Sequence, residues 1–311
     1  MGTTWSVQVS AANFPNANEL HEELDALLKR LDVEVFSTWT ENSELSRLNA
    51  SAPGEALAVS PPLMAVLVMA KVLYAETGHA FDITIGPLVN LWGFGPQPTL
   101  PEVPDAAVIE QQLQKLGMAD LILDQVNNTV LKRKAVSLDL SAIAKGYAVD
   151  AAANLLMQEG YTSFLVEIGG EIRAQGLRPD QKPWVIAIEA PIADSRDAYD
   201  ALANYGKAIA VAGSGDYRNF RMIDGTRYSH EIDPRTGYPI THNLAAVTVI
   251  ADSAAQADAW ATALMVLGPD EGKALADSEN LAAYFIMRNG TALEHTHTAA
   301  FARFLYPKQG I

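Results

Sequence analysis

One segment near the C-terminus constrains the fold most, because it must form a helix that is buried on nearly every side. Residues 253–256 (Ser-Ala-Ala-Gln) have the form of a capping box, which predicts a helix start. Residues 268–269 (Gly-Pro) predict its end. Between them, apart from one indole N–H, the polar side chains of residues 257–267 are Asp258 and Thr262. A helix of this composition belongs in the core of the protein.

Asp258 and Thr262 are four residues apart and therefore lie on one face of this helix, one turn from each other. A carboxylate that is buried alone costs several kcal/mol, so Asp258 must be paired, protonated or bound to a metal. The carboxylate and the hydroxyl could both bind one Mg²⁺ ion, which accepts few protein oxygens and leaves coordination positions for phosphates. Alternatively, Asp258 pairs with a basic side chain, and Thr262 bonds back to its own helix. The spacing favours neither reading.

The net charge excludes one class of partner. The chain has 311 residues, a formal net charge of −15 and a pI near 4.7. So acidic a protein repels a phosphate backbone, and we expect no nucleic-acid partner. For the same reason, a small phosphate ligand would need a local positive charge, which a metal ion can supply. The chain has no cysteine, which excludes disulfides, thiol catalysis and thiolate-bound metals.

The spacing of apolar residues predicts an α+β fold, because helical and alternating segments mix without a regular strand–helix–strand repeat. No linker or domain boundary is visible. Asn127-Asn128 and Asn289-Gly290 each predict a hairpin turn, the first within residues 121–131. We expect helices at 16–31, 60–76, 105–116, 142–158 and 254–267, a surface loop at 95–104, and strands at 5–9, 136–140, 164–168, 184–188, 208–212, 246–250, 281–287 and 291–295.

The sequence does not predict a transmembrane segment. The longest apolar run, residues 63–70, stops at Lys71 and is too short to span a bilayer. No signal peptide is visible either, because the first residues already have the pattern of the strand at 5–9. We expect that a leader was removed ahead of this strand.

Eight motifs, spread over nearly the whole chain, together resemble the ApbE family of flavin transferases. Each motif alone is modest, but their combination in this order is highly specific. They are MGTTWSV at 1–7, SELSRLN at 43–49, FDITIGPLVNLWGFG at 81–95, LDLSAIAKGYAVD at 138–150, EIGGE at 167–171, SGDYR at 214–218, SHEIDPRTG at 229–237 and ADAWATAL at 257–264.

The resemblance implies an ApbE-like fold related to the T-fold, with residues 1–311 forming a single domain of two interlocked lobes and the FAD and metal site between them. Members use FAD as a substrate at a Mg²⁺ centre. They transfer FMN to a threonine or serine hydroxyl of a target flavoprotein and release AMP. By similarity, the metal ligands are Asp258, Thr262 and the backbone carbonyl of Ala142, which agrees with the buried pair described above.

The resemblance also assigns a set of FAD contacts: Met1, Trp39, Ala80, Phe81, Asp82, Asp139 and Lys145. Ser214 joins them on a different ground. Gly213-Ser214-Gly215 follows an expected strand, and such a segment forms either an anion-binding turn or a plain turn.

Four of these FAD contacts have simpler interpretations. Asp139 is expected at the end of a strand, where it either caps the next helix or lies beside a phosphate. Lys145 is in the first turn of that helix, where a cation opposes the helix dipole, so it binds a phosphate or pairs with Asp139. Asp82 is expected to share a strand face with Thr84, and that face could equally be solvated. Trp39 is either a core residue or a stacking partner of the flavin, in a position where the family often has tyrosine.

His230 is the histidine that the resemblance makes the candidate general base. It precedes the turn-rich segment 232–237, and functional residues tend to lie in such loops. Asp233 and Arg235 in that segment could orient the imidazole or a phosphate. His295 and His297 share a face of an expected hairpin strand, which we interpret as solvated rather than as a metal site.

Two rival functions remain open. A pyrophosphatase that hydrolyses FAD to FMN and AMP would need the same residues. A carrier or flavoprotein that only keeps FAD would not need a metal at the pyrophosphate. The resemblance implies targets among flavoprotein subunits of membrane electron-transport complexes, of the sodium-pumping NADH:quinone oxidoreductase or Rnf type. It also implies a periplasmic or extracytoplasmic location, with a membrane anchor in an N-terminal segment missing from this chain.

Overall fold

The chain divides into two compact units, and each is discontinuous in sequence. The computed structural model describes residues 2–10, 16–96, 102–193 and 195–307. The unit that we call the large-sheet unit contains residues 2–28, 145–218 and those from 242 onward; the small-sheet unit contains residues 29–144 and 219–241. Met1 and part of the expected loop at 95–104 lie outside the described residues.

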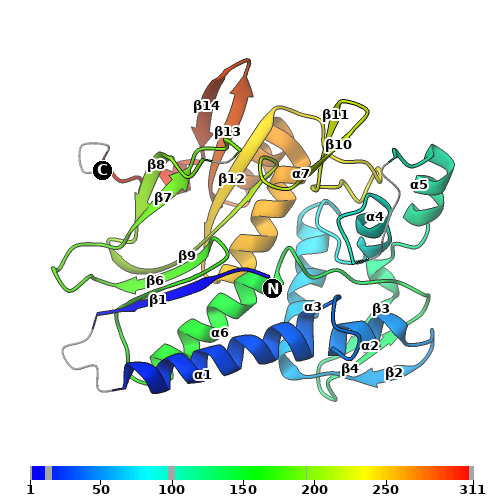
Figure 1. Cartoon of the computed structure of the whole chain (residues 1–311), viewed down its shortest axis with the longest axis horizontal. Helices are drawn as coiled ribbons and strands as arrows, with labels where there is room; N and C mark the ends of the chain where they lie inside the picture. Colours follow the sequence, from blue (N-terminus) through cyan, green and yellow to red (C-terminus); the bar gives the residue numbers. More distant parts are fainter. Residues whose placement is uncertain (1, 11–15, 97–101, 194, 308–311) are drawn as a thin grey trace. The chain divides into compact units, whose positions relative to one another are not determined.

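A seven-stranded antiparallel sheet forms the centre of the large-sheet unit (Figure 1). Its strand order is β1-β5-β6-β9-β12-β13-β14, and a hairpin of β7 and β8 lies outside it. The strands are β1 (Trp5–Val9), β5 (Phe164–Ile168), β6 (Glu171–Gly176), β7 (Val185–Glu189), β8 (Ala198–Ala203), β9 (Gly206–Gly215), β12 (Leu244–Ala251), β13 (Ala282–Asn289) and β14 (Ala292–His297).

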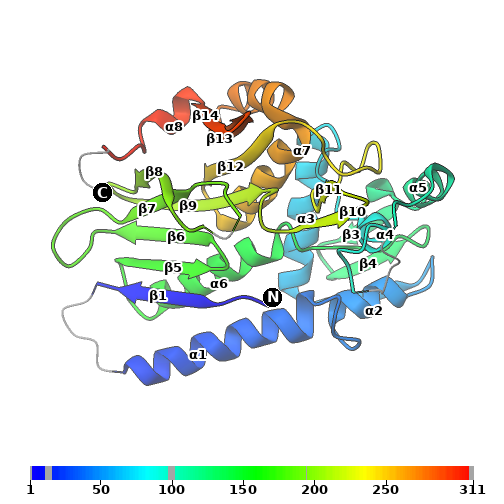
Figure 2. The same cartoon turned by 45° about the horizontal axis from the view of Figure 1, so that its top comes forward.

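Helix α7 (Ala254–Ser278) packs against β9 and β12 of this sheet. Its first turn lies against the start of α6 (Ala144–Gln158), a proximity that is also visible in Figure 2. A Cβ at Gly146 would lie 2.2 Å from the carbonyl oxygen of Ala254, so the two backbones can approach this closely only with glycine there. Helices α1 (Ala17–Lys29) and α8 (Ala299–Ala302) complete the unit.

The small-sheet unit contains a three-stranded antiparallel sheet of order β2-β4-β3 and a separate hairpin of β10 and β11. The strands are β2 (Ala56–Ala58), β3 (Leu121–Asp124), β4 (Thr129–Lys132), β10 (Phe220–Ile223) and β11 (Thr226–Ser229). The helical elements in the described residues of this unit are η1 (Arg30–Phe36), α2 (Glu44–Ala50), α3 (Pro61–Glu76), α4 (Gly86–Leu91), α5 (Ala106–Leu113) and the 3-10 turn η2 (Met118–Asp120).

The predicted α+β class is confirmed, as are both hairpin turns and the start of the 254–267 helix. The Ser253 side chain accepts a hydrogen bond from the Gln256 N–H, as a capping residue does. Gly268 leaves the helical conformation with a φ of 81°, so the predicted stop is real. After this kink, however, Pro269 begins a second helical segment that the sequence analysis did not predict. Within the described residues no helix has both the length and the apolar character to span a membrane.

Three local predictions are wrong. Residues 136–140 are not a strand but an extended segment with one isolated bridge, between Ser137 and Ile85. The segment around Asp82 is likewise a turn, because Asp82 accepts hydrogen bonds from the backbone N–H and hydroxyl of Thr84. Residues 213–215 form no turn and instead continue strand β9, where Ser214 pairs with Val247.

Candidate active site

Asp258 is buried in the large-sheet unit and has partners that the sequence did not identify. Its side chain points at the start of α6 and the residue is only 2% exposed. One carboxylate oxygen accepts a hydrogen bond of 3.1 Å from the backbone N–H of Gly146. This N–H belongs to the first turn of α6, where backbone donors have no partner in their own helix and favour an anion.

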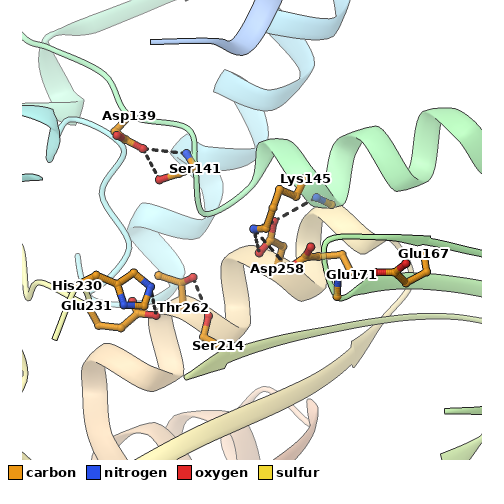
Figure 3. A network of polar contacts seen from close by, with 12 residues as sticks. Asp139, Ser141, Lys145, Glu167, Glu171, Ser214, His230, Glu231, Asp258 and Thr262 are labelled. Atoms are coloured by element: carbon orange, nitrogen blue, oxygen red, sulfur yellow. Dashed lines mark hydrogen bonds and ion pairs between the residues drawn. The ribbon is translucent and has the colours of Figure 1, made fainter. Parts of the chain in front are cut away.

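Lys145 is a basic side chain that pairs with Asp258 (Figure 3). Such a pair was the alternative to a metal at Asp258. Its Nζ lies 3.4 and 3.5 Å from the two carboxylate oxygens of Asp258 and 3.3 Å from Oε1 of Glu171. Burial disfavours the ammonium, but the charges of Asp258 and Glu171 outweigh it and raise the pKa of Lys145 above its ordinary value. The side chain therefore stays protonated at neutral pH.

Glu171 is a member of this cluster that the sequence analysis gave no role. It begins β6, directly after the Gly169-Gly170 turn, and is 3% exposed. Its Oε2 atom has no hydrogen-bond partner among the described residues. Burial and the charge of Asp258 raise the pKa of Glu171 to about 8. Nothing in the sequence around Glu171 marks it as buried; it is the fold that places it beside Lys145.

Thr262 lies one turn beyond Asp258 and does not follow the alternative in which it bonds to its own helix. Its hydroxyl is 3.0 Å from the hydroxyl of Ser214 on β9 (Figure 3). Ser214 is therefore brought together with a predicted metal ligand, although it belongs to a strand and not to the expected turn.

The residues of this cluster fit a hard cation such as Mg²⁺. Above the raised pKa of Glu171, where both carboxylates are ionised, Asp258 and Glu171 share the one ammonium of Lys145, which leaves an excess of buried negative charge. The oxygens on offer are a carboxylate and a hydroxyl, which suit Mg²⁺ better than a soft metal. No group of three His, Asp or Glu side chains in the described part of the chain could hold a metal. A cation here would thus use few protein oxygens, as Mg²⁺ does with phosphates.

Asp150 is an acidic residue that connects helices α6 and α7. Its carboxylate on α6 accepts hydrogen bonds from the first N–H groups of α7, 2.9 Å from Ala254 N and 3.0 Å from Ala255 N. It also pairs with Arg173 at 2.6 Å. The two helices therefore bind each other reciprocally, because the start of α6 binds Asp258 of α7 and the start of α7 binds Asp150 of α6.

In the small-sheet unit, two predicted FAD-binding segments lie side by side. The backbone N–H of Asp139 donates to the carbonyl of Ile83 at 2.8 Å, next to Asp82. Asn49, the last residue of the SELSRLN motif, holds the neighbouring Leu138 through both of its side-chain amide atoms, at 2.7 and 2.9 Å. The fold thus gives Asn49 a positioning role that its place in the sequence did not suggest.

The predicted FAD-binding side chains of this unit differ in their surroundings. Ala80 and Phe81 are buried, and burial raises the pKa of the adjacent Asp82. Asp139 caps the turn before α6 by accepting hydrogen bonds from the Ser141 backbone and hydroxyl, which fits the capping alternative. Trp39 is 73% exposed, which rules out the core alternative and leaves an indole face open to a ligand.

His230 follows β11 in the small-sheet unit, and one nitrogen of its ring is bonded to a backbone carbonyl. Nδ1 is 2.9 Å from the carbonyl oxygen of Asn219, which can only accept, so Nδ1 carries the proton of this hydrogen bond. Oε1 of the buried Glu231 lies 3.7 Å from Nε2. The side chain is 31% exposed, which leaves it accessible to a substrate. The role of His230 as general base stays a prediction, and Nε2 is the nitrogen that would take the proton, because Nδ1 is bonded to the Asn219 carbonyl.

Asp233 and Arg235 pair with each other, and their expected role in orienting the imidazole or a phosphate stays a prediction. Arg235 forms a bidentate ion pair with Asp233, with contacts of 3.0 Å from Nε and 2.9 Å from the terminal nitrogen. The carbonyl of Asp233 also closes the turn by accepting from Gly237 at 2.8 Å. This pair stabilises the turn after His230. Asn219 and Glu231 are the residues that contact the imidazole. Both of the latter were missed, although Glu231 is part of the quoted SHEIDPRTG motif.

The roles predicted for the remaining site residues stay predictions. Ala142 lies in the turn before α6. The expectation of one domain with its site between two lobes, and the combined metal set of Ala142, Asp258 and Thr262, also stay predictions.

Comparison with known proteins identifies the class. The model of the ApbE family matches residues 1–285. A protein named FAD:protein FMN transferase from Klebsiella pneumoniae (strain 342) is 38% identical over 308 residues, which is 98% of this chain and 87% of that protein. The apo flavinyl transferase ApbE of Pseudomonas stutzeri superposes with a TM-score of 0.88 at 41% identity, over 98% of this chain and 94% of that one. The flavin transferase ApbE of Vibrio cholerae gives 0.88 at 38% identity, over 98% and 96%. The chain belongs to the ApbE family.

Proposed function

We propose that this protein transfers FMN from FAD to a threonine or serine hydroxyl of a target flavoprotein and releases AMP. Membership in the ApbE family supports the activity, and one observation supports its chemistry: a buried Asp258 carboxylate held at the start of α6 beside Lys145. In this reaction the hydroxyl oxygen bonds to the phosphorus of the FMN half. The bond from that phosphorus to the AMP oxygen breaks.

For the metal, we propose Mg²⁺ with Asp258, Thr262 and the carbonyl of Ala142 as ligands. When bound, it would neutralise charge on the pyrophosphate and on the departing AMP. Lys145 adds positive charge from the protein itself, which matters in a chain with a net charge of −15. We propose the remaining FAD contacts at Met1, Trp39, Ser214, Asp139 and segment 80–82.

For proton transfer, we propose His230 as the base that takes the proton of the attacking hydroxyl on Nε2. The Asn219 carbonyl holds Nδ1–H and so keeps Nε2 available. The Glu231 carboxylate would stabilise the imidazolium that forms. The Asp233–Arg235 pair would keep the following turn in place.

For the partner, we propose flavoprotein subunits of membrane electron-transport complexes, of the NADH:quinone oxidoreductase or Rnf type, and a periplasmic or other extracytoplasmic location. Both rest on the family resemblance.

The test is incubation with FAD, Mg²⁺ and a candidate target subunit, followed by mass spectrometry of protein and nucleotide products. We expect the target to gain one FMN phosphoester for each AMP released, and chelation of the metal to stop both. FMN and AMP without a modified target would identify a pyrophosphatase, and intact FAD would identify a carrier.

The metal ligand is tested separately by measuring Mg²⁺ binding to Asp258→Asn. We expect binding to be lost with the fold retained, because the variant removes the buried charge that the cation balances. Asp252→Asn is the matched control, since Asp252 is exposed just before α7. Wild-type Mg²⁺ affinity and activity in Asp258→Asn would show that Asp258 is structural.

A further inference from the structure

Glu171 is a buried carboxylate for which the proposed reaction has no use. Among the described residues, Glu171 makes no hydrogen bond to the Thr262 hydroxyl or to the Asp258 carboxylate. It contacts the cluster through its ion pair with Lys145, at 3.3 Å. Its other oxygen has no hydrogen-bond partner among the described residues. A buried carboxylate with one oxygen unpartnered is costly and needs an explanation.

The position of the Lys145 ammonium supplies that explanation. Nζ lies at almost the same distance from Oδ1 of Asp258, 3.4 Å, as from Oε1 of Glu171, 3.3 Å (Figure 3). The ammonium is therefore shared by two carboxylates. If a cation takes the oxygens of Asp258, like-charge repulsion acts on the ammonium, and the Glu171 carboxylate still attracts it.

We propose that Glu171 is a positioning residue that holds the Lys145 ammonium whenever the Asp258 carboxylate binds the divalent cation. This inference rests on the proposed Mg²⁺ site. Without the Glu171 charge, the ammonium would lose one of the two carboxylates that attract it and would compete more strongly with the cation for Asp258. Glu171 thus acts on the metal through Lys145.

The test is a double-mutant cycle of Mg²⁺ binding measured by isothermal titration calorimetry on the full chain. All titrations are run at pH 8.5, where the Glu171 carboxylate is mostly ionised in the metal-free protein. We expect Glu171→Gln to weaken Mg²⁺ binding about tenfold, which corresponds to roughly 1.4 kcal/mol. In a Lys145→Met background the same substitution should have a clearly smaller effect, because the competing ammonium is gone.

Glu171→Asp keeps the charge on a shorter side chain and should recover part of the lost affinity, which a purely structural role of the glutamate would not predict. Glu159→Gln is the matched control, since Glu159 is exposed in the turn directly after α6, and it should bind Mg²⁺ like the wild type. Thermal unfolding shows whether each variant is folded. If Glu171→Gln is not folded, the Mg²⁺ affinity of Glu171→Asp is compared with that of the wild type instead.

Three outcomes would overturn the inference. Wild-type Mg²⁺ affinity in Glu171→Gln would show that the carboxylate is not needed. An equal loss in both backgrounds would show that Glu171 acts on the cation directly and not through Lys145. Wild-type Mg²⁺ binding by Asp258→Asn would remove the metal site itself and the inference with it, whereas loss of binding in that variant leaves the proposed site standing and isolates the role of Glu171.

Discussion

At the scale of single residues, the site depends on groups whose state is set by one or two neighbours. The imidazole of His230 is an example, because a single backbone carbonyl accepts the hydrogen bond of its Nδ1. We predict that His230→Ala lowers FMN transfer by roughly 10²- to 10⁴-fold, the usual cost of removing a general base. FAD affinity, measured by fluorescence quenching, should stay near the wild-type value, because a base acts in the transition state.

His21→Ala is a suitable control, since His21 is exposed on α1 and stacks on Trp5. A His230→Ala variant that transfers FMN at the normal rate would remove His230 from the mechanism. One that no longer binds FAD would make it a cofactor contact.

Trp39 allows a second test at this scale, because so exposed a side chain contributes little to stability. We predict that Trp39→Ala weakens FAD binding several-fold, since an aromatic stacking contact is worth about 0.5–1.5 kcal/mol beyond its buried area. Trp39→Phe should retain most of the affinity, and neither variant should change the melting temperature. Unchanged FAD affinity in Trp39→Ala would place the flavin elsewhere.

At the scale of elements, the reciprocal binding of α6 and α7 holds the residues of the proposed metal site in place. We predict that Asp150→Asn lowers the free energy of unfolding by about 1–3 kcal/mol, because it weakens two N–H contacts and the ion pair with Arg173. Chemical denaturation measures the change, with the exposed Asp252→Asn as control. If Asp150→Asn and the control have equal stability, Asp150 does not join the helices.

At the scale of the whole molecule, stability should depend on pH through Glu171. Its pKa is raised from 4.5 to about 8 in the folded protein, so between these values the folded state binds a proton that the unfolded state lacks. The stabilising contribution is complete below about pH 4.5 and is lost as the pH rises through about 8. Many other carboxylates titrate in the same range, so the prediction concerns the difference in stability between the wild type and Glu171→Gln. Metal-free wild type should lose stability relative to Glu171→Gln between pH 5 and 8, and parallel curves would contradict it.

The sequence by itself determined the α+β class, both hairpins and the buried helix with Asp258 and Thr262, because these follow from local periodicity, capping and turn chemistry. It also determined the family, through motifs in a fixed order. The tertiary structure alone decided which side chains surround Asp258. Lys145 and Glu171 are far from α7 in sequence, and only the packing of α6 and β6 beside it brings them there. The same packing places Asp150 at the first N–H groups of α7. The errors at segments 81–84, 136–140 and 213–215 have the same origin, since backbone pairing and an Asx turn overrode the local pattern.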